Sequence, residues 1–484
     1  MKTRGLPMPA ANRRLQINLS YRSLAIGVVV VLCLGQAVLG GDLLIIGYCV
    51  MAICFGLIPI WLFGINSSIG MFFALLLFFF PVSALLVKTC LLQTIQSGLF
   101  VPDLTFEVMV TGMAAASAAT ALLYFCKQQL RAKPLFQPLS PAALRMLILI
   151  NTPVAVFGIF GYSLPGALGR IAALTGGLIF LSLAAATQLA LIRSKGARGL
   201  SLESGLFLVF CVFYALAVNS KQGFFATGSC YLMTVYLYRN RIDRFDLLLI
   251  SLGSVILFFV VAPAINVARE IREDASAFEL IERTISVTTQ LLTGNSEELT
   301  KITNYDFGDD NYYTRYVSDT TSAIDRFVFV SYLDSMLRFT SDKFMGYAAT
   351  LNYLVEAIMP NLFDPGQKAV ASAGDKALQY YGIFSDDLIA QITLPVFGEG
   401  YVVDGFVGVI ILTFMLFLVE GASLIFILGD LRGNVFAQWW IALNGFVIAG
   451  TSVSGALFQV FRITPIYIIL YLLAKTLSTK TIVR

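Results

Sequence analysis

The chain of 484 residues contains no histidine. Acid–base catalysis by imidazole and histidine metal ligation are therefore excluded. The seven cysteines all lie in apolar stretches or at their edges, and none lies between residues 268 and 404. This distribution indicates neither a disulfide framework nor a thiolate metal site. We expect no cofactor and no bound metal.

Charged residues are also scarce, at 13% of the chain, whereas hydrophobic residues make up 58% and the mean hydropathy is +0.81. This composition is typical of a polytopic membrane protein. A transmembrane helix needs about 20 predominantly apolar residues. Twelve apolar runs are predicted as spans: 24–40, 43–65, 69–87, 106–126, 144–162, 168–192, 200–217, 223–238, 246–267, 405–428, 436–452 and 457–474. Residues 223–238 are the weakest, so eleven spans are the alternative.

One long polar segment, residues 268–404, separates these runs. The sequence thus predicts an all-α protein with three parts: about nine spans in 1–267, a large extramembrane loop in 268–404 and about three spans in 405–484. An extramembrane active site is expected in or beside the loop.

Lysine and arginine near span ends indicate orientation, because they are retained on the cytoplasmic side. With twelve spans, nineteen of them fall in one set of loops and termini, and three fall in the short loops of the other set. Both termini are therefore expected in the cytoplasm and the polar segment on the opposite side. The basic N-terminus is interpreted as preceding a retained first span.

The polar segment holds 21 carboxylates and ten basic residues, so any anion site within it must be local. Arg269 stands two residues after the predicted span that ends at residue 267, at headgroup level. The alternative is that it snorkels and pairs with Glu273. Residues 268–285 are otherwise predicted to form an amphipathic helix on the membrane, with Ile271, Phe278, Ile281 and Ile285 on its apolar face.

A second candidate region is residues 322–339, which are apolar except for one stripe. Ser331, Asp334, Ser335 and Arg338 recur at helical spacing, and Arg326 lies near the start. The stretch predicts a helix buried against the spans that presents polar groups to a cavity. The alternative is an Asp334–Arg338 ion pair that closes on itself.

Arg462 lies inside the final apolar run, about one turn from its predicted outward end. A charge in that position usually faces a cavity or a partner. The small and polar residues 450–455 leave room for a headgroup beside it, and outward snorkelling is the alternative.

The segment from residue 394 to residue 408 runs into a span and contains Glu399 and Asp404, both expected at the outer membrane face. Its glycines, at positions 398, 400, 405 and 408, permit a tight turn and a close approach to another element. A simple re-entry turn is the alternative interpretation. Because histidine is absent, proton abstraction would fall to a carboxylate and leaving-group stabilisation to arginine.

Taken together, these residues resemble the Wzy-type O-antigen and exopolysaccharide repeat-unit polymerases. The resemblance lies in the layout of the spans, in Arg269, in Ala357-Ile-Met-Pro-Asn-Leu-Phe-Asp-Pro-Gly366, and in Gly398-Glu-Gly-Tyr-Val-Val-Asp-Gly-Phe-Val-Gly408. The last motif is similar to Gly-Glu-x-Tyr-x-x-Phe-Gly-x-x-Gly in that family. Glu399, Tyr401, Gly405 and Gly408 match it, whereas Asp404 stands where phenylalanine is usual.

This resemblance implies a glycosyltransferase of the GT-C type in the bacterial inner membrane, with the large loop in the periplasm. It would transfer a glycan chain from undecaprenyl pyrophosphate to a lipid-linked repeat unit. The implied catalytic residues are Glu399, Arg269, Arg326 and Arg462, and the implied substrate-binding residues are Arg338, Tyr401, Asp404 and Asp334. A Wzz-type chain-length regulator and a Wzx-type flippase are the expected protein partners, and nucleic acid is not one.

Two other classes remain open. A lipid-linked oligosaccharide flippase or other transporter also needs many spans and buried arginines, but should not need a large outward loop, and no internal repeat is evident. An O-antigen ligase has a similar layout, but that family is thought to depend on a histidine in its outward loop.

Overall fold

The computed structural model describes residues 19–160, 172, 175–218, 221–239, 243–256, 261, 264–265, 277–293, 316–317, 328–340, 344–358, 395–450 and 453–482. Within these ranges the regular structure is entirely helical, apart from one isolated antiparallel bridge between Ser67 and Asp430. The all-α prediction is confirmed for the described part of the chain.

The N-terminal helices are α1 (Leu19–Val38), α2 (Leu43–Phe63), α3 (Ser68–Leu77), η1 (Phe78–Val82), α4 (Ser83–Cys90) and α5 (Pro102–Leu130). Next follow α6 (Pro141–Phe160), η3 (Gly176–Leu178), α8 (Ile179–Arg193), α9 (Leu202–Ala217), α10 (Lys221–Arg239) and α11 (Arg244–Ile256). The predicted loop contains α13 (Ala277–Leu292), α15 (Phe329–Phe339) and α16 (Tyr347–Ile358). The C-terminal part comprises α18 (Val396–Ala422), η8 (Ser423–Leu428), α19 (Val435–Gly450), α20 (Val453–Phe458), η9 (Gln459–Ile463) and α21 (Thr464–Ile482).

Every one of the twelve apolar runs contains a helix. In the described residues, seven helical stretches are long and apolar enough to cross a membrane: Leu43–Phe63, Ser68–Cys90, Pro102–Leu130, Pro141–Ile159, Gly176–Arg193, Val396–Leu428 and Gly455–Thr479. Ile26–Val38 and Leu202–Ala217 are shorter apolar helices. The protein is therefore a multi-pass membrane protein, and the full count of twelve stays a prediction.

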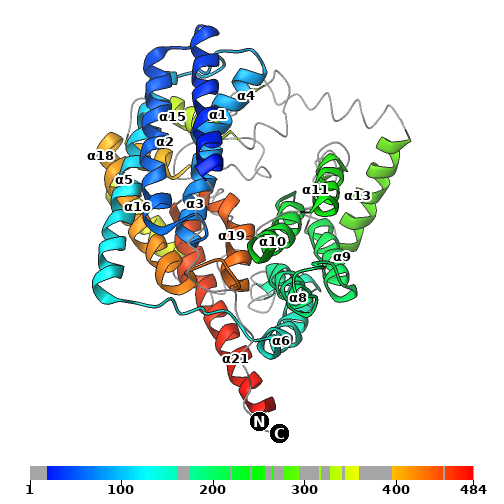
Figure 1. Ribbon diagram of the computed structural model, residues 1–484. Coiled ribbons are helices and arrows are strands. Elements are labelled where there is room, and N and C mark those ends of the chain that lie inside the picture. The colour runs from blue at the N-terminus through cyan, green and yellow to red at the C-terminus, as the bar shows by residue number, and fades with distance from the viewer. Residues whose placement is uncertain are drawn as a thin grey trace.

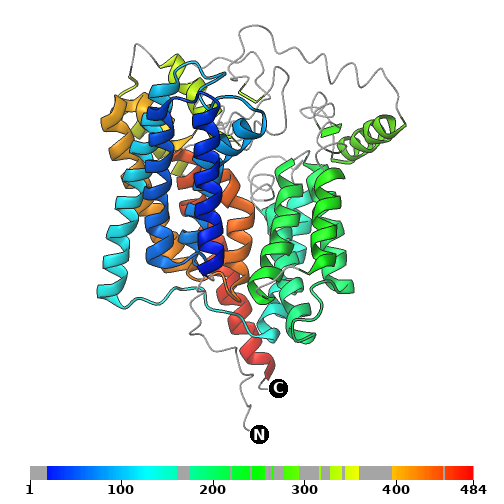
Figure 2. The ribbon, with the colours of Figure 1, turned by 45° about the horizontal axis from the view of Figure 1, so that its top comes forward.

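The helices form two groups (Figures 1 and 2). The first group contains α1–α5 and α18, with α5 packed along both α2 and α18. The second contains α6 and α8–α11. Two C-terminal helices join the groups, because α19 packs against α3 on one side and against α8 and α10 on the other, while α21 packs against α6.

Helix α8 is the centre of the second group. Every side chain from Ile179 to Leu191 is buried, as expected for a helix that is apolar on all sides. Local sequence fixes the start of several helices. Ser201, for example, begins α9 with a reciprocal capping box to Ser204, in which each hydroxyl accepts the backbone N–H of the other residue.

Figure 2 places α13 toward one end of the molecule and the end of α21, together with the link between α5 and α6, toward the other. This arrangement agrees with the prediction that the polar segment and the C-terminus lie on opposite sides of the membrane. The side of the membrane on which each end lies stays a prediction.

The predicted amphipathic helix 268–285 corresponds in part to α13, and residues 266–276 lie outside the described residues. Leu280, Thr284 and Val287 are buried on the side of α13 that packs against α9, whereas Ile281 is half-buried and Ile285 is exposed. The predicted apolar face toward the membrane stays a prediction.

Candidate functional site

The segment that carries the polymerase-like motif is helical rather than a loop. Helix α18 begins at Val396, so residues 396–403 form a short helical half ahead of the span predicted from residue 405. The two halves meet at a break, where Asp404 is extended (φ −162°, ψ 46°) and Gly405 has φ +56° and ψ −142°. Glycine adopts this positive φ without steric cost.

The break in α18 is held from outside by the residues that lead into α16. The carbonyl groups of Val402 and Val403 accept hydrogen bonds from the backbone N–H groups of Met345 (2.9 Å) and Gly346 (3.0 Å). Carbonyl groups freed by a broken helix would otherwise be costly inside a membrane protein. The break is therefore stabilised by tertiary hydrogen bonds to the freed carbonyl groups.

The expected close approach of glycines is confirmed at Gly400 and Gly408. A Cβ atom on Gly408 would lie 2.1 Å from the Gly400 carbonyl oxygen, and one on Gly400 would lie 2.7 Å from the Val409 Cα. Only glycine at both positions permits this contact between the two halves of α18. The contact fixes the orientation of the first half of α18 relative to the second half.

Glu399 is carried by that first half, and its side chain is completely buried. Its Oε2 atom accepts a hydrogen bond from the backbone N–H of Val453, the first residue of α20. Its Oε1 atom has no hydrogen-bond partner. Glu399 is thus buried between α18 and α20, with one carboxylate oxygen unpaired. Its position at the outer membrane face stays a prediction.

Arg462 lies in the π-helical turn η9 and is partly buried. Its guanidinium Cζ is 5.2 Å from the centre of the Phe458 ring. Because the helix continues from Val453 through η9, Arg462 is nine residues, or about 13 Å of helix, beyond the end that Glu399 contacts. It is therefore deeper in the final helix than the predicted single turn.

Asp334 of α15 is buried and acts as a cap for another helix. Its Oδ2 accepts the N–H of Phe100 (2.9 Å), and its Oδ1 accepts the N–H of Val101 (2.9 Å) and the Thr105 hydroxyl (3.1 Å). Val101, the residue before α5, has no side-chain cap of its own. Burial raises the pKa of Asp334, and these hydrogen bonds oppose the rise. This geometry favours a structural role.

Arg338, one turn after Asp334, is exposed and stacks on Phe100, with 3.8 Å from its Cζ to the ring centre. The charge of Arg338 lowers the pKa of Asp334, while both carboxylate oxygens of Asp334 also accept hydrogen bonds from residues 100 and 101. The alternative of an Asp334–Arg338 ion pair stays open. The predicted polar stripe is real, but Ser331 and Ser335 are buried and donate to carbonyl groups within α15 itself.

Tyr401 and Asp404 flank the break. The Tyr401 ring meets the rings of Phe344 (5.9 Å) and Phe406 (5.5 Å) edge-on. Desolvation raises the pKa of the Tyr347 hydroxyl, and a hydrogen bond to the Asp404 carboxylate and its charge raise it further. Both predicted residues therefore connect α18 to the beginning of α16.

Arg269, Arg326 and most of the Ala357–Gly366 motif lie outside the described residues. Whether these arginines join Glu399 stays a prediction. In the described part of the chain, no group of three or more Cys, Asp and Glu side chains could hold a metal ion.

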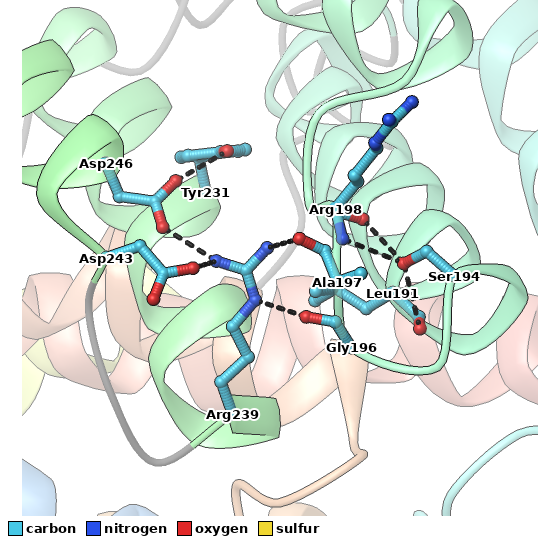
Figure 3. A network of polar contacts seen from close by, with 9 residues as sticks. All are labelled: Leu191, Ser194, Gly196, Ala197, Arg198, Tyr231, Arg239, Asp243 and Asp246. Carbon is cyan, nitrogen blue, oxygen red and sulfur yellow. Dashed lines mark hydrogen bonds and ion pairs between the residues drawn. The ribbon is translucent and has the colours of Figure 1, made fainter.

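A second polar network occurs in the other helix group, around Arg239 (Figure 3). The Arg239 guanidinium bonds to Asp243 (2.9 Å) and Asp246 (2.8 Å) and donates to the carbonyl groups of Gly196 (2.7 Å) and Ala197 (2.9 Å). Tyr231 donates to the remaining oxygen of Asp246. Arg239 was counted among the basic residues that indicate orientation, and it also ties the turn after α8 to α10 and α11.

Glu420, in the second half of α18, was not singled out from the sequence. It is 1% exposed, and neither carboxylate oxygen has a hydrogen-bond partner. The available signal was a single carboxylate inside the apolar run 405–428.

In comparisons with protein-family models, curated proteins and solved structures, no match to the chain is found.

Proposed function

We propose that the chain is a membrane glycosyltransferase that polymerises lipid-linked oligosaccharide repeat units at the outer face of the bacterial inner membrane. The observation that carries the proposal is Glu399, a buried carboxylate with one oxygen unpaired, held at a glycine-dependent break in a membrane helix. The position of Glu399 within the polymerase-like motif supports the same function.

In the proposed reaction, a hydroxyl group of the acceptor sugar attacks the anomeric carbon of the donor chain. The bond from that carbon to the pyrophosphate oxygen breaks, undecaprenyl pyrophosphate leaves as an anion, and Glu399 accepts the hydroxyl proton. Arg462, with Arg269 and Arg326, would hold the pyrophosphate, since a planar guanidinium can bond two phosphate oxygens at once. Arg338, Tyr401, Asp404 and Asp334 would shape the acceptor site, the last through its hold on α5.

Access to Glu399 requires a local rearrangement in this proposal, because its side chain is fully buried and bonded to the N–H of Val453. Exchange of that bond for one to the acceptor would switch the carboxylate from capping α20 to binding substrate.

A second function is favoured by a separate observation. Broken membrane helices and unpaired intramembrane carboxylates also occur at the substrate sites of transporters. The break at Asp404 and Gly405 and the buried Glu420 thus suit a lipid-linked oligosaccharide flippase as the alternative.

The test is a gel of lipid-linked and surface glycan from a strain that lacks the chain, with and without complementation. A polymerase predicts that single repeat units replace the ladder of long chains in the deletion strain. Absence of all outward glycan would favour the flippase, and full-length unattached polymer would indicate a ligase. Full ladders in the deletion strain would reject all three.

The topology that this proposal needs is twelve spans, cytoplasmic termini and residues 268–404 in the periplasm. Alkaline phosphatase fused at Asn311 should be active and a C-terminal fusion inactive. The reverse result would place the proposed site on the wrong side of the membrane.

A further inference from the structure

Glu420 has no role in the proposed transfer reaction, yet it occupies an unusual position. It lies in the candidate span Val396–Leu428, its side chain is 1% exposed, and neither of its oxygens has a hydrogen-bond partner. Three residues later the helix changes from α to π at Ser423, a feature that is frequent at functional sites.

Two other buried polar groups on the same helix are also unpaired. The hydroxyl oxygens of Thr413 and Ser423 have no hydrogen-bond partner. Thr413 is seven residues before Glu420 and Ser423 three residues after it, so helical geometry places all three on one side of the helix. We call Thr413, Glu420 and Ser423 the α18 polar stripe.

The helices that pack around Glu420 supply little charge. At the neighbouring Gly421, an added Cβ would lie 2.8 Å from Leu123 of α5 and 3.8 Å from Ile69 of α3. Helices α3, η8 and α20 contain no titratable residue. The nearest charged residue of α5 at this level is Lys127, one turn beyond Leu123, and it interacts electrostatically with Asp430.

The remaining charged groups on helices packed against α18 lie toward its opposite end. Asp334 and Arg338 of α15 belong to the cap and the stack at the start of α5, and Tyr347 of α16 contacts Asp404 at the break. Helix α16 also contains Tyr353 and Glu356, and the residues that lead into this helix meet α18 at that break. Asp430 and Arg432 lie in the turn after η8, beyond Ser423.

An ionised carboxylate without a partner is costly in an apolar interior, so Glu420 requires a ligand that neutralises it. A metal cation would need a cage of several oxygen ligands, and the described residues contain no cluster of three acidic or thiol groups. A proton needs only one acceptor atom.

We propose that Glu420 is a proton-binding site in the membrane core. It exchanges its proton with the side of the membrane that carries the Asp430–Arg432 turn, and Ser423 lies between Glu420 and that turn. The step is the addition of one proton to the carboxylate and its release, with no other reactant. This inference goes beyond the proposed sugar transfer and does not depend on it.

The test is infrared spectroscopy of the full chain in nanodiscs at neutral pH. The wild-type spectrum minus that of Glu420→Gln should contain the C=O band of a protonated carboxyl group, with the shift expected on transfer to D2O. The matched control is Glu282→Gln, an exposed glutamate on α13 outside the predicted spans, whose difference spectrum should contain carboxylate bands instead. Carboxylate bands in the Glu420→Gln difference at neutral pH would overturn the proposal.

A second experiment tests whether the other fully buried glutamate, Glu399, accounts for the protonated band. In a Glu399→Gln background, the protonated band assigned to Glu420 should persist, and alkaline titration should convert it to carboxylate bands in one step. If the band disappears with Glu399→Gln and not with Glu420→Gln, the proton belongs to Glu399 and the inference is wrong. The proposed function is tested separately, by the glycan ladders of the deletion strain, so failure of this inference and failure of the proposed function can be told apart.

Discussion

Each of the two helix groups contains a buried titratable side chain, and the two side chains differ in how completely their polar atoms are hydrogen-bonded. In the second group, Arg239 uses its guanidinium in four bonds to carboxylates and carbonyl groups, and Tyr231 completes the coordination of Asp246. In the first group, Glu399 is equally buried but one of its oxygens is unpaired. A network in which every polar atom is paired rigidifies a fold, whereas a buried polar atom without a partner needs a separate explanation. The contrast predicts a structural role for Arg239 and a chemical role for Glu399.

The largest expected effect is the loss of Arg239. Arg239→Met would leave Asp246 buried without its cation, so the free energy of unfolding should fall by about 3–5 kcal/mol. Thermal unfolding in detergent is the measurement. Arg193→Met is the matched control, because Arg193 pairs with Glu203 on the surface, where an ion pair contributes at most about 1 kcal/mol. Equal losses of unfolding free energy for the two variants would show that the buried Arg239 network is no more stabilising than a surface ion pair.

Glu399→Gln should give the opposite pattern, with stability retained and activity lost. The amide keeps the shape of the side chain but cannot take up a proton, so polymerisation should slow by about 10²–10³-fold, as when one transition-state contact is lost. Ladder length and single-turnover rates measure this, with Glu282→Gln, an exposed glutamate on α13, as control. A normal ladder would show that Glu399 only caps α20 and takes no part in the reaction.

Arg462 in η9 sharpens the comparison, because its proposed role depends on the planar geometry of its guanidinium as well as on its charge. Arg462→Ala should abolish or greatly shorten the polymer, and Arg462→Lys should recover little, because lysine keeps the charge but loses the bidentate fork. An arginine that only snorkels would tolerate lysine. Protein level and membrane insertion, measured in parallel, should be unchanged.

Asp334 on α15 tests whether a predicted site residue that is fully hydrogen-bonded behaves differently from Glu399. Asp334→Ala would leave the buried N–H groups of Phe100 and Val101 without acceptors and should cost about 1–3 kcal/mol of stability for each. Any activity lost should follow the loss of folded protein. A variant that is fully folded and inactive would assign Asp334 to the substrate site.

The smallest expected effect is that of divalent metal removal, which we predict to leave polymerisation in vitro unchanged. The chain has no histidine, and residues 268–404 contain no cysteine. Acidic residues such as Asp306, Asp309 and Asp310 could hold calcium or magnesium through oxygen ligands. Activity that is lost on chelation and restored by either ion would contradict the prediction.

Some of the local geometry at the candidate site could be predicted from the motif alone. Its glycines predicted a tight turn and a close approach, and Gly405 and the Gly400–Gly408 contact show both. The helical state of residues 396–403 was not predicted, because a glycine-rich segment next to a span suggests a loop. Contacts with α15 and α16 decide the outcome: Leu333 and Met336 pack over Gly398, and Met345 and Gly346 hold the break.

The sequence by itself determined that this is an all-helical membrane protein without histidine chemistry, because hydropathy and composition are local properties that add along the chain. Only the tertiary structure decided which buried charges are satisfied. Val453 lies 54 residues from Glu399, Val101 lies 233 residues from Asp334, and the Gly196 carbonyl lies 43 residues from Arg239. Hydrogen bonding depends on distances of about 3 Å between atoms, and no sequence spacing specifies such distances across separate helices.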